Sequence, residues 1–159
     1  MCNRISDPVQ SPAHYTVYPV EPIEITRHLG FCLGNAVKYV LRAPYKNGVE
    51  DCDKACQYLV WEGNTPQRSL TPASYQKTSD ACGKLRAYLT NAQGDQLWSE
   101  IAQVQREFID SLQNYTLESG RRYLEDMFLF ARELGRILSL RDTTGQIYEG
   151  MNGMPQGRV

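Results

Sequence analysis

The sequence predicts an all-α protein. In its second half, apolar residues recur every three or four positions, most clearly over residues 96–115, and this spacing places them on one face of a helix. No stretch shows the convincing alternation of apolar and polar residues that a half-buried strand requires. Glycines and prolines punctuate the first 62 residues and residues 63–72. We therefore expect a small helical domain with an extended N-terminal arm, followed by a helical extension of about three helices.

Prolines and glycines divide the first part of the chain. Three prolines and no helical period predict that residues 1–21 form an extended arm on the surface. Pro22 suits the first position of a helix, and Pro44 predicts the end of the next one, because the residue before a proline avoids the helical region. The predicted elements are the arm, a short helix ended by Gly30, a helix over about 34–43 that starts at the Gly34-Asn35 break, an Asn47-Gly48 turn with positive φ, and a helix from about Glu50 to Trp61.

A change of composition separates the longer helices from the first part. Residues 63–72 combine Gly, Asn and two prolines and are predicted to be a linker. The helix over 96–115 carries Leu112 in a broad apolar stripe, which is typical of a core or of subunit contacts. The predicted division is a domain over 1–62, the linker, helices over about 73–90, 96–115 and 117–140 within an extension over 73–141 that packs on the domain or builds a homo-oligomer, and a mobile tail over 142–159.

Composition excludes several classes of partner. The chain has 159 residues with 17 Lys and Arg against 18 Asp and Glu, so it lacks the basic balance of a protein that binds duplex nucleic acid. No apolar run is long enough for a membrane span, and the first residues lack the core of a signal peptide. Five cysteines without a C-x-x-C pair suggest reduced thiols in a cytosol. Cys52 and Cys56 are four apart, but burial as small apolar residues is favoured over a zinc site.

One face of the second predicted helix is polar and cationic. Asn35, Lys38 and Arg42 share this face, while the opposite side of the helix is apolar. A guanidinium forks onto phosphate oxygens and an ammonium adds a mobile point charge, so the face suits an anion. The alternative for such a stripe is a solvated helix surface.

Further polar and aromatic side chains follow the same pattern. Asp51, Lys54 and Tyr58 share one face of the third predicted helix. Within the whole candidate group, tyrosines could stack on a base and His14 or Asp51 could handle a proton. The structural alternative is that Asp51 complements the dipole of its helix or pairs with Arg42 or Lys46. The candidate group is His14, Tyr15, Glu24, Asn35, Lys38, Tyr39, Arg42, Lys46, Asp51, Lys54 and Tyr58.

Common catalytic motifs do not occur in this sequence. It contains neither the phosphate-binding motif G-x-x-x-x-G-K-[ST] nor the dinucleotide motif G-x-G-x-x-G. It also lacks H-E-x-x-H, G-x-S-x-G and an E-x-x-E pattern repeated on two helices, so a dedicated hydrolytic metal site is not indicated. Phosphates would have to be held by lysines and arginines on helices.

Four ordered segments resemble a known family. They read S-P-A-H-Y, P-I-E-I, F-C-L-G-N-A-V-K-Y-V-L-R-A and K-N-G-V-E-D-C-D-K-A-C-Q-Y-L, and they lie between Ser11 and Trp61. This pattern is similar to the SaV-like domain of bacteriophage proteins, a family that includes a podoviral nucleotide kinase without a P-loop. The resemblance implies a phage protein that acts on nucleotides in the host cytoplasm.

The resemblance also implies roles for individual residues. Lys38, Arg42 and Lys54 would neutralise phosphates during transfer from a nucleoside triphosphate to a deoxynucleoside monophosphate. Glu24 or Asp51 would orient the acceptor or hold a metal ion such as the Mg²⁺ that accompanies a triphosphate. In the alternative, the protein sequesters a nucleotide signal or binds a host defence component without chemistry. The family motif falls on His14, Tyr15, Glu24, Gly34, Asn35, Lys38, Tyr39, Arg42, Lys46, Asp51, Lys54 and Tyr58.

Overall fold

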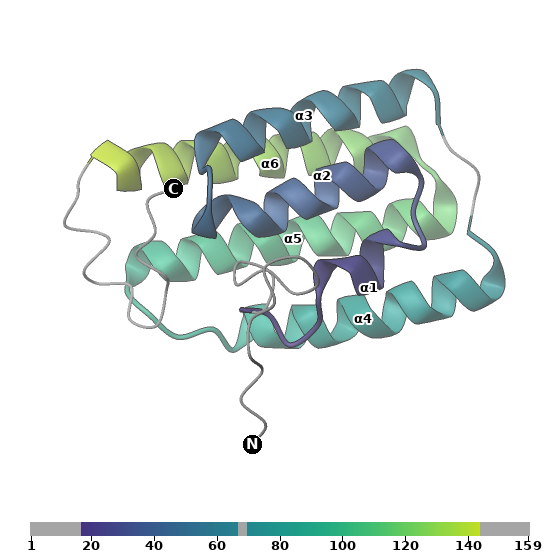
Figure 1. The fold of residues 1–159 in the computed structure, drawn as a ribbon, viewed down its shortest axis with the longest axis horizontal. Helices are drawn as coiled ribbons and strands as arrows, with labels where there is room; N and C mark the ends of the chain where they lie inside the picture. The colour runs from purple at the N-terminus through teal and green to yellow at the C-terminus, as the bar shows by residue number, and fades with distance from the viewer. Residues whose placement is uncertain (1–16, 67–69, 144–159) are drawn as a thin grey trace.

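The computed structural model describes residues 17–66 and 70–143. This part of the chain contains six α-helices and no strand, which confirms the predicted all-α class. The predicted arm and tail, with His14 and Tyr15, lie almost entirely outside the described residues. The helices are α1 (Pro22–Thr26), α2 (Phe31–Arg42), α3 (Val49–Asn64), α4 (Pro72–Thr90), α5 (Gln96–Glu118) and α6 (Arg121–Thr143), with a 3₁₀ turn (Ala43–Tyr45) after α2 (Figure 1).

The helices pack as a closed ring of neighbours. From one neighbour to the next the order is α2, α3, α6, α5 and α4, and the short α1 contacts both α4 and α2 (Figure 1). Buried apolar side chains from α1–α3 and from α4–α6 belong to one continuous core. None of the helices in the described part of the chain has the length and apolar content of a membrane span.

The apolar stripe of α5 lies at the centre of this core. Phe108, Ile109 and Leu112 are fully buried, and α5 packs between α4 and α6. Of the two roles predicted for this stripe, the structure places Leu112 in the interior of the single chain. A substitution there therefore tests folding, whereas subunit contacts need an exposed position.

A buried polar side chain connects α5 to the end of α2. Pro44 has no N–H, so it cannot supply the helical hydrogen bond that the carbonyl of Val40 would otherwise accept. The side-chain amide of Gln105 donates to this carbonyl at 3.1 Å and to the hydroxyl of Tyr18 at 3.0 Å. Tyr18 in turn donates to the carbonyl of Leu41 at 2.7 Å. Side chains distant in sequence thus complete the carboxyl end of α2.

The start of α2 differs from the prediction. The helix begins at Phe31, because Gly30 is the extended N-cap residue and its carbonyl accepts the N–H of Gly34 at 2.9 Å. The predicted break at Gly34-Asn35 is wrong, since Gly34 is buried inside the helix and the Asn35 amide donates to the carbonyl of Phe31 at 2.8 Å. The longer helix carries Phe31 on the same element as the cationic residues. The predicted turn with positive φ is confirmed at Gly48, where φ is 54°.

Gly135 marks a close approach of α6 to α3. A Cβ at Gly135 would lie 3.2 Å from the Cβ of Cys52, whereas a Cβ at Gly83 on α4 would meet nothing within 4 Å. We expect Gly83→Ala to raise the free energy of unfolding by about 1 kcal/mol, because alanine favours a helix. Gly135→Ala should gain less or lose stability, because the buried Cys52 has to shift. Urea denaturation of both variants measures this difference, and equal gains would contradict a tight α3–α6 contact.

Candidate functional site

Three cationic side chains converge on the ring of Tyr39. The Nζ atom of Lys38 lies 4.5 Å from the ring centroid, the Cζ atom of Arg42 lies 4.9 Å from it and the Nζ atom of Lys54 lies 5.5 Å from it. Lys38 and Arg42 flank Tyr39 on α2, and Lys54 comes from α3. The π face of a tyrosine attracts cations, which offsets part of the repulsion among these like charges.

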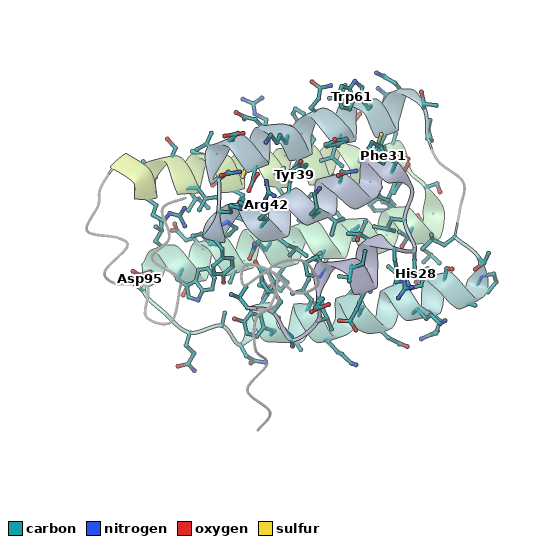
Figure 2. All side chains as sticks on the ribbon, viewed as in Figure 1. His28, Phe31, Tyr39, Arg42, Trp61 and Asp95 are labelled. Carbon is teal, nitrogen blue, oxygen red and sulfur yellow. The ribbon has the colours of Figure 1, made fainter. Side chains whose placement is uncertain are left out.

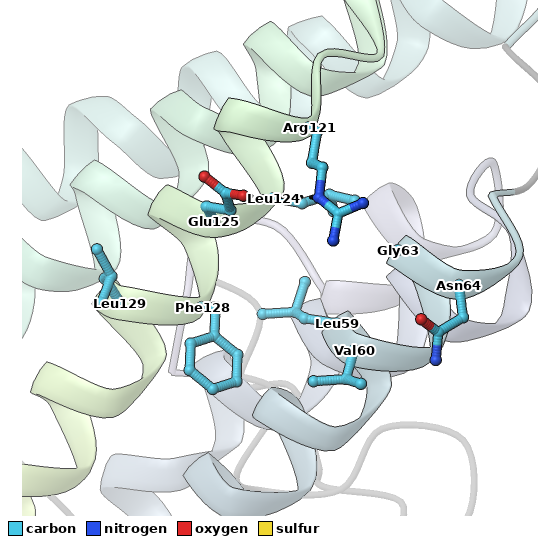
Figure 3. A pocket seen from close by; sticks show the side chains of 9 residues that line it. All are labelled: Leu59, Val60, Gly63, Asn64, Arg121, Leu124, Glu125, Phe128 and Leu129. Atoms are coloured by element: carbon cyan, nitrogen blue, oxygen red, sulfur yellow. Dashed lines mark ion pairs between the residues drawn. The ribbon is translucent and has the colours of Figure 1, made fainter.

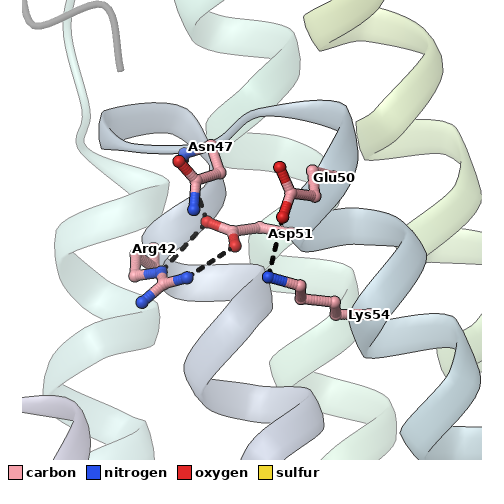
Figure 4. A network of polar contacts seen from close by, with 5 residues as sticks. All are labelled: Arg42, Asn47, Glu50, Asp51 and Lys54. Atoms are coloured by element: carbon pink, nitrogen blue, oxygen red, sulfur yellow. Dashed lines mark hydrogen bonds and ion pairs between the residues drawn. The ribbon is translucent and has the colours of Figure 1, made fainter.

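Buried Asp51 fixes the position of Arg42. The Nε of Arg42 donates to one carboxylate oxygen at 3.1 Å and its Nη2 donates to the other at 2.8 Å (Figure 4). The N–H of Asn47 also donates to this carboxylate, at 3.3 Å. The side chain of Asp51 is 0% exposed and that of Arg42 is 14% exposed. This bidentate pair joins α2 to the start of α3, as in the structural alternative considered for Asp51.

The two lysines differ in their acidic partners. Lys54 forms an ion pair of 2.8 Å with Glu50 one turn earlier on α3 (Figure 4), and this hydrogen bond raises the pKa of Lys54. Lys38 pairs with no carboxylate among residues 17–66 and 70–143. The site therefore carries more positive than negative charge around Tyr39.

Aromatic rings continue from Tyr39 toward the other end of the helix pair. Tyr39 and Tyr58 are stacked, with centroids 5.9 Å apart and planes at 15°. Tyr58 meets Phe31 at 5.8 Å and Trp61 at 5.3 Å, both edge to face. Phe31 is 72% exposed and Trp61 is 48% exposed. Both lie toward one end of the α2–α3 pair, with Arg42 toward the other (Figure 2).

These seven side chains form the candidate site. It has an aromatic end and a cationic end on the outer surface of two adjacent antiparallel helices, with the Tyr39–Tyr58 stack between them. We call it the α2–α3 face, and its residues are Phe31, Lys38, Tyr39, Arg42, Lys54, Tyr58 and Trp61.

Other predicted site residues lie around or away from this face. Asn35 is half-buried on α2, and Lys46 is exposed in the turn before α3. Glu24 lies on α1, where its carboxylate accepts the N–H of Glu21 at 2.6 Å. Glu24 lines a groove between α1 and α4 together with Lys77. Among the described side chains, no group of three or more His, Cys, Asp or Glu residues is arranged to hold a metal ion.

Sequence reasoning missed Phe31 and Trp61 as site residues. Trp61 lies three residues after Tyr58, a spacing that places both on one side of a helix. Phe31 was outside the predicted limits of its helix. A signal for both was present in the sequence, namely aromatic residues at helical spacing from the tyrosines.

A charged side chain near the end of α3, Glu62, is buried. Glu62 is 1% exposed, and its carboxylate accepts a hydrogen bond of 2.9 Å from the hydroxyl of Tyr115 on α5. Burial and this bond raise the pKa of Tyr115. Glu62 therefore belongs to the interior between α3 and α5 and does not extend the α2–α3 face.

A separate groove lies between α3 and α6. It has a volume of about 390 Å³, with apolar walls that include Leu59, Leu124 and Phe128 (Figure 3). Arg121 and Glu125 lie at this groove and approach each other to 3.6 Å. None of the predicted site residues lines it.

Comparison with known proteins matches one segment of the chain. No curated protein and no solved structure was found to match the chain. Residues 9–60 match DUF3310, a family of proteins of unknown function. The match reaches from before α1 to the penultimate turn of α3, so it includes every residue of the α2–α3 face except Trp61. It gives no link to a nucleotide kinase, and the SaV-like resemblance stays a prediction. About a third of this chain is thus similar to a family whose function is unknown.

Proposed function

We propose that the α2–α3 face binds a nucleotide. The base would stack at the aromatic end and the phosphates would lie at the cationic end. The observation that carries this proposal is the convergence of Lys38, Arg42 and Lys54 on one ring that itself stacks on a second ring. A ligand with a flat aromatic group joined to an anion matches both ends.

Electrostatics supports an anionic ligand at the cationic end. Asp51 and Glu50 offset the charges of Arg42 and Lys54, and Lys38 adds a further positive charge. Arg42 is held in place, because both carboxylate oxygens of Asp51 bind it. Phosphate oxygens would relieve the remaining repulsion among the cations, which supplies a reason for affinity.

The placement of the acidic residues favours binding over phosphoryl transfer. Transfer requires a group beside the phosphates that orients the acceptor or holds a metal ion. Among the described acidic residues, Asp51 is engaged by Arg42 and Asn47, Glu50 is paired with Lys54, and Glu24 lies on α1 in its own capping interaction. We therefore propose a protein that holds a nucleotide unchanged, as the sequestration alternative requires, in place of the kinase implied by resemblance.

Quenching of tryptophan fluorescence tests the binding proposal. Trp61 and Trp98 are the two tryptophans, and Trp98 is 5% exposed, so a base stacked on the face should quench mainly Trp61. We expect saturable quenching by deoxynucleoside mono- and triphosphates and much less by nucleosides. Lys38→Ala should weaken binding by about five- to twentyfold, because a charge-assisted contact is lost.

Two controls accompany this titration. Lys84→Ala removes an exposed lysine from α4 and should leave the affinity unchanged. Trp61→Phe should abolish the quenching while calorimetry still records binding. Absence of saturable binding by every common nucleotide would overturn the proposal. Mass spectrometry of the recovered ligand separates the two alternatives, since a phosphorylated product would show a transferase and an unchanged nucleotide would support sequestration.

A further inference from the structure

The aromatic end of the α2–α3 face carries two exposed rings. Phe31 comes from the first turn of α2 and Trp61 from the last turns of α3. Their planes make angles of 76° and 80° with the plane of Tyr58, so neither ring stacks on Tyr58. By contrast, Tyr39 and Tyr58 are parallel within 15°, with their centroids 5.9 Å apart. The face thus offers two exposed rings, Phe31 and Trp61, on which bases could stack.

From these two rings we propose that the ligand is a single-stranded oligonucleotide of at least two bases. This inference rests on the proposed nucleotide site. A mononucleotide supplies one base, whereas a strand of two or more bases can place separate bases on Phe31 and on Trp61. Stacking on aromatic side chains tolerates any base, and successive bases of a strand commonly use successive rings.

The length of the face agrees with a strand. Phe31 and Arg42 are at opposite ends of α2, and a rise of 1.5 Å per residue separates them by about 16 Å along the helix. A single nucleotide that stacks on one ring and places its phosphates among the cations has no second base for the other ring. A strand has further bases and phosphates along this length, because its backbone runs on from the stacked bases to the cations. Lys38 and Lys54 lie with Arg42 around Tyr39, at the cationic end of this path.

The charge of the face distinguishes a strand from other occupants. A duplex hides the faces of its bases within the stack, so it cannot use Phe31 and Trp61 as platforms. A protein partner could cover the two aromatic rings, but three cations around Tyr39 favour a polyanion. The single strand uses both ends of the face together.

Calorimetric titration with thymidine oligonucleotides of one, two, four and eight residues tests this inference. We expect the affinity to rise at least about tenfold from the mononucleotide to the tetranucleotide. Phe31→Ala and Trp61→Ala should each weaken tetranucleotide binding by about five- to a hundredfold, and one of the two should leave mononucleotide binding within about twofold. Leu117→Ala, which removes an exposed apolar side chain on α5, is the matched control and should change neither affinity.

The outcomes separate this inference from the proposed function. Equal affinities for the mononucleotide and the tetranucleotide would overturn the inference and leave the nucleotide site standing. No binding of either ligand would overturn both. Salt dependence gives an independent measure, because each neutralised phosphate contributes about −0.7 to the slope of log K against log salt for a single strand. Lys38→Ala should make that slope shallower, and an unchanged slope would count against phosphate contact at Lys38.

Discussion

Replacing Arg42 with methionine is expected to lower the free energy of unfolding by about 3–5 kcal/mol. The substitution leaves the carboxylate of Asp51 fully buried without the guanidinium that binds both of its oxygens. A buried charge that loses its partner costs more than the pair contributed, because its desolvation is no longer compensated. Urea denaturation followed by circular dichroism measures the loss.

Two further variants isolate the ion pair. Lys38→Met removes a neighbouring cation from the same ring, and a change below about 0.5 kcal/mol is expected because Lys38 has no buried carboxylate to leave behind. The double variant Arg42→Met/Asp51→Leu removes both charges and should recover most of the stability lost in Arg42→Met. An exposed ion pair contributes about 1 kcal/mol or less. A free energy of unfolding for Arg42→Met within about 1 kcal/mol of the parent would therefore contradict a buried ion pair that joins α2 to α3. Because Arg42 is structural in this way, Lys38 is the cleaner residue for tests of ligand binding.

Leu112→Asp is expected to prevent the chain from folding, so that no cooperative unfolding transition is observed. Leu112 is fully buried on α5, and an aspartate there would be a carboxylate in an apolar core. The cost of several kcal/mol is comparable with the total stability of a domain of this size. Loss of the cooperative thermal transition, recorded by circular dichroism, is the measurement.

Leu129→Asp is the matched control for that experiment. Leu129 is 60% exposed on α6 and lines the α3–α6 groove, so the same substitution there should leave the fold intact. Sedimentation of this variant also tests whether the exposed side of α6 makes the subunit contacts of the predicted homo-oligomer. A folded Leu112→Asp protein would contradict the position assigned to the α5 stripe.

Helical periodicity was sufficient to predict the long helices. The helix predicted over 96–115 is α5, whose first turn is capped by the Asp95 carboxylate, which accepts the N–H of Trp98 at 2.9 Å. The boundary before α6 was harder, because Ser119 takes a left-handed conformation with φ of 54° and ends α5 there. Periodicity reports which side of a helix is apolar, but a one-residue change of backbone conformation leaves no periodic trace.

Five of the seven residues of the α2–α3 face were predicted from the sequence, but their arrangement was not. The spacing of Lys38 and Arg42 placed both on one side of α2, and that part of the prediction depends on a single helix. Asp51 is buried because α3 lies against α2, so that the guanidinium of Arg42 on α2 can bind its carboxylate. The sequence offered the pairing of Asp51 with Arg42 as one alternative, but neither helix alone decides between it and an exposed carboxylate.

Gln105 makes one end of the candidate site depend on a distant part of the chain. The α2–α3 pair is local in sequence, and local contacts normally form early. However, the carbonyl of Val40 obtains its donor from a side chain 65 positions further along, because Pro44 offers none. The carboxyl end of α2, which carries Arg42, is therefore complete only when α5 is packed against it. We expect a change that loosens α5 to release the last turn of α2, so the geometry of the α2–α3 face depends on the second half of the chain.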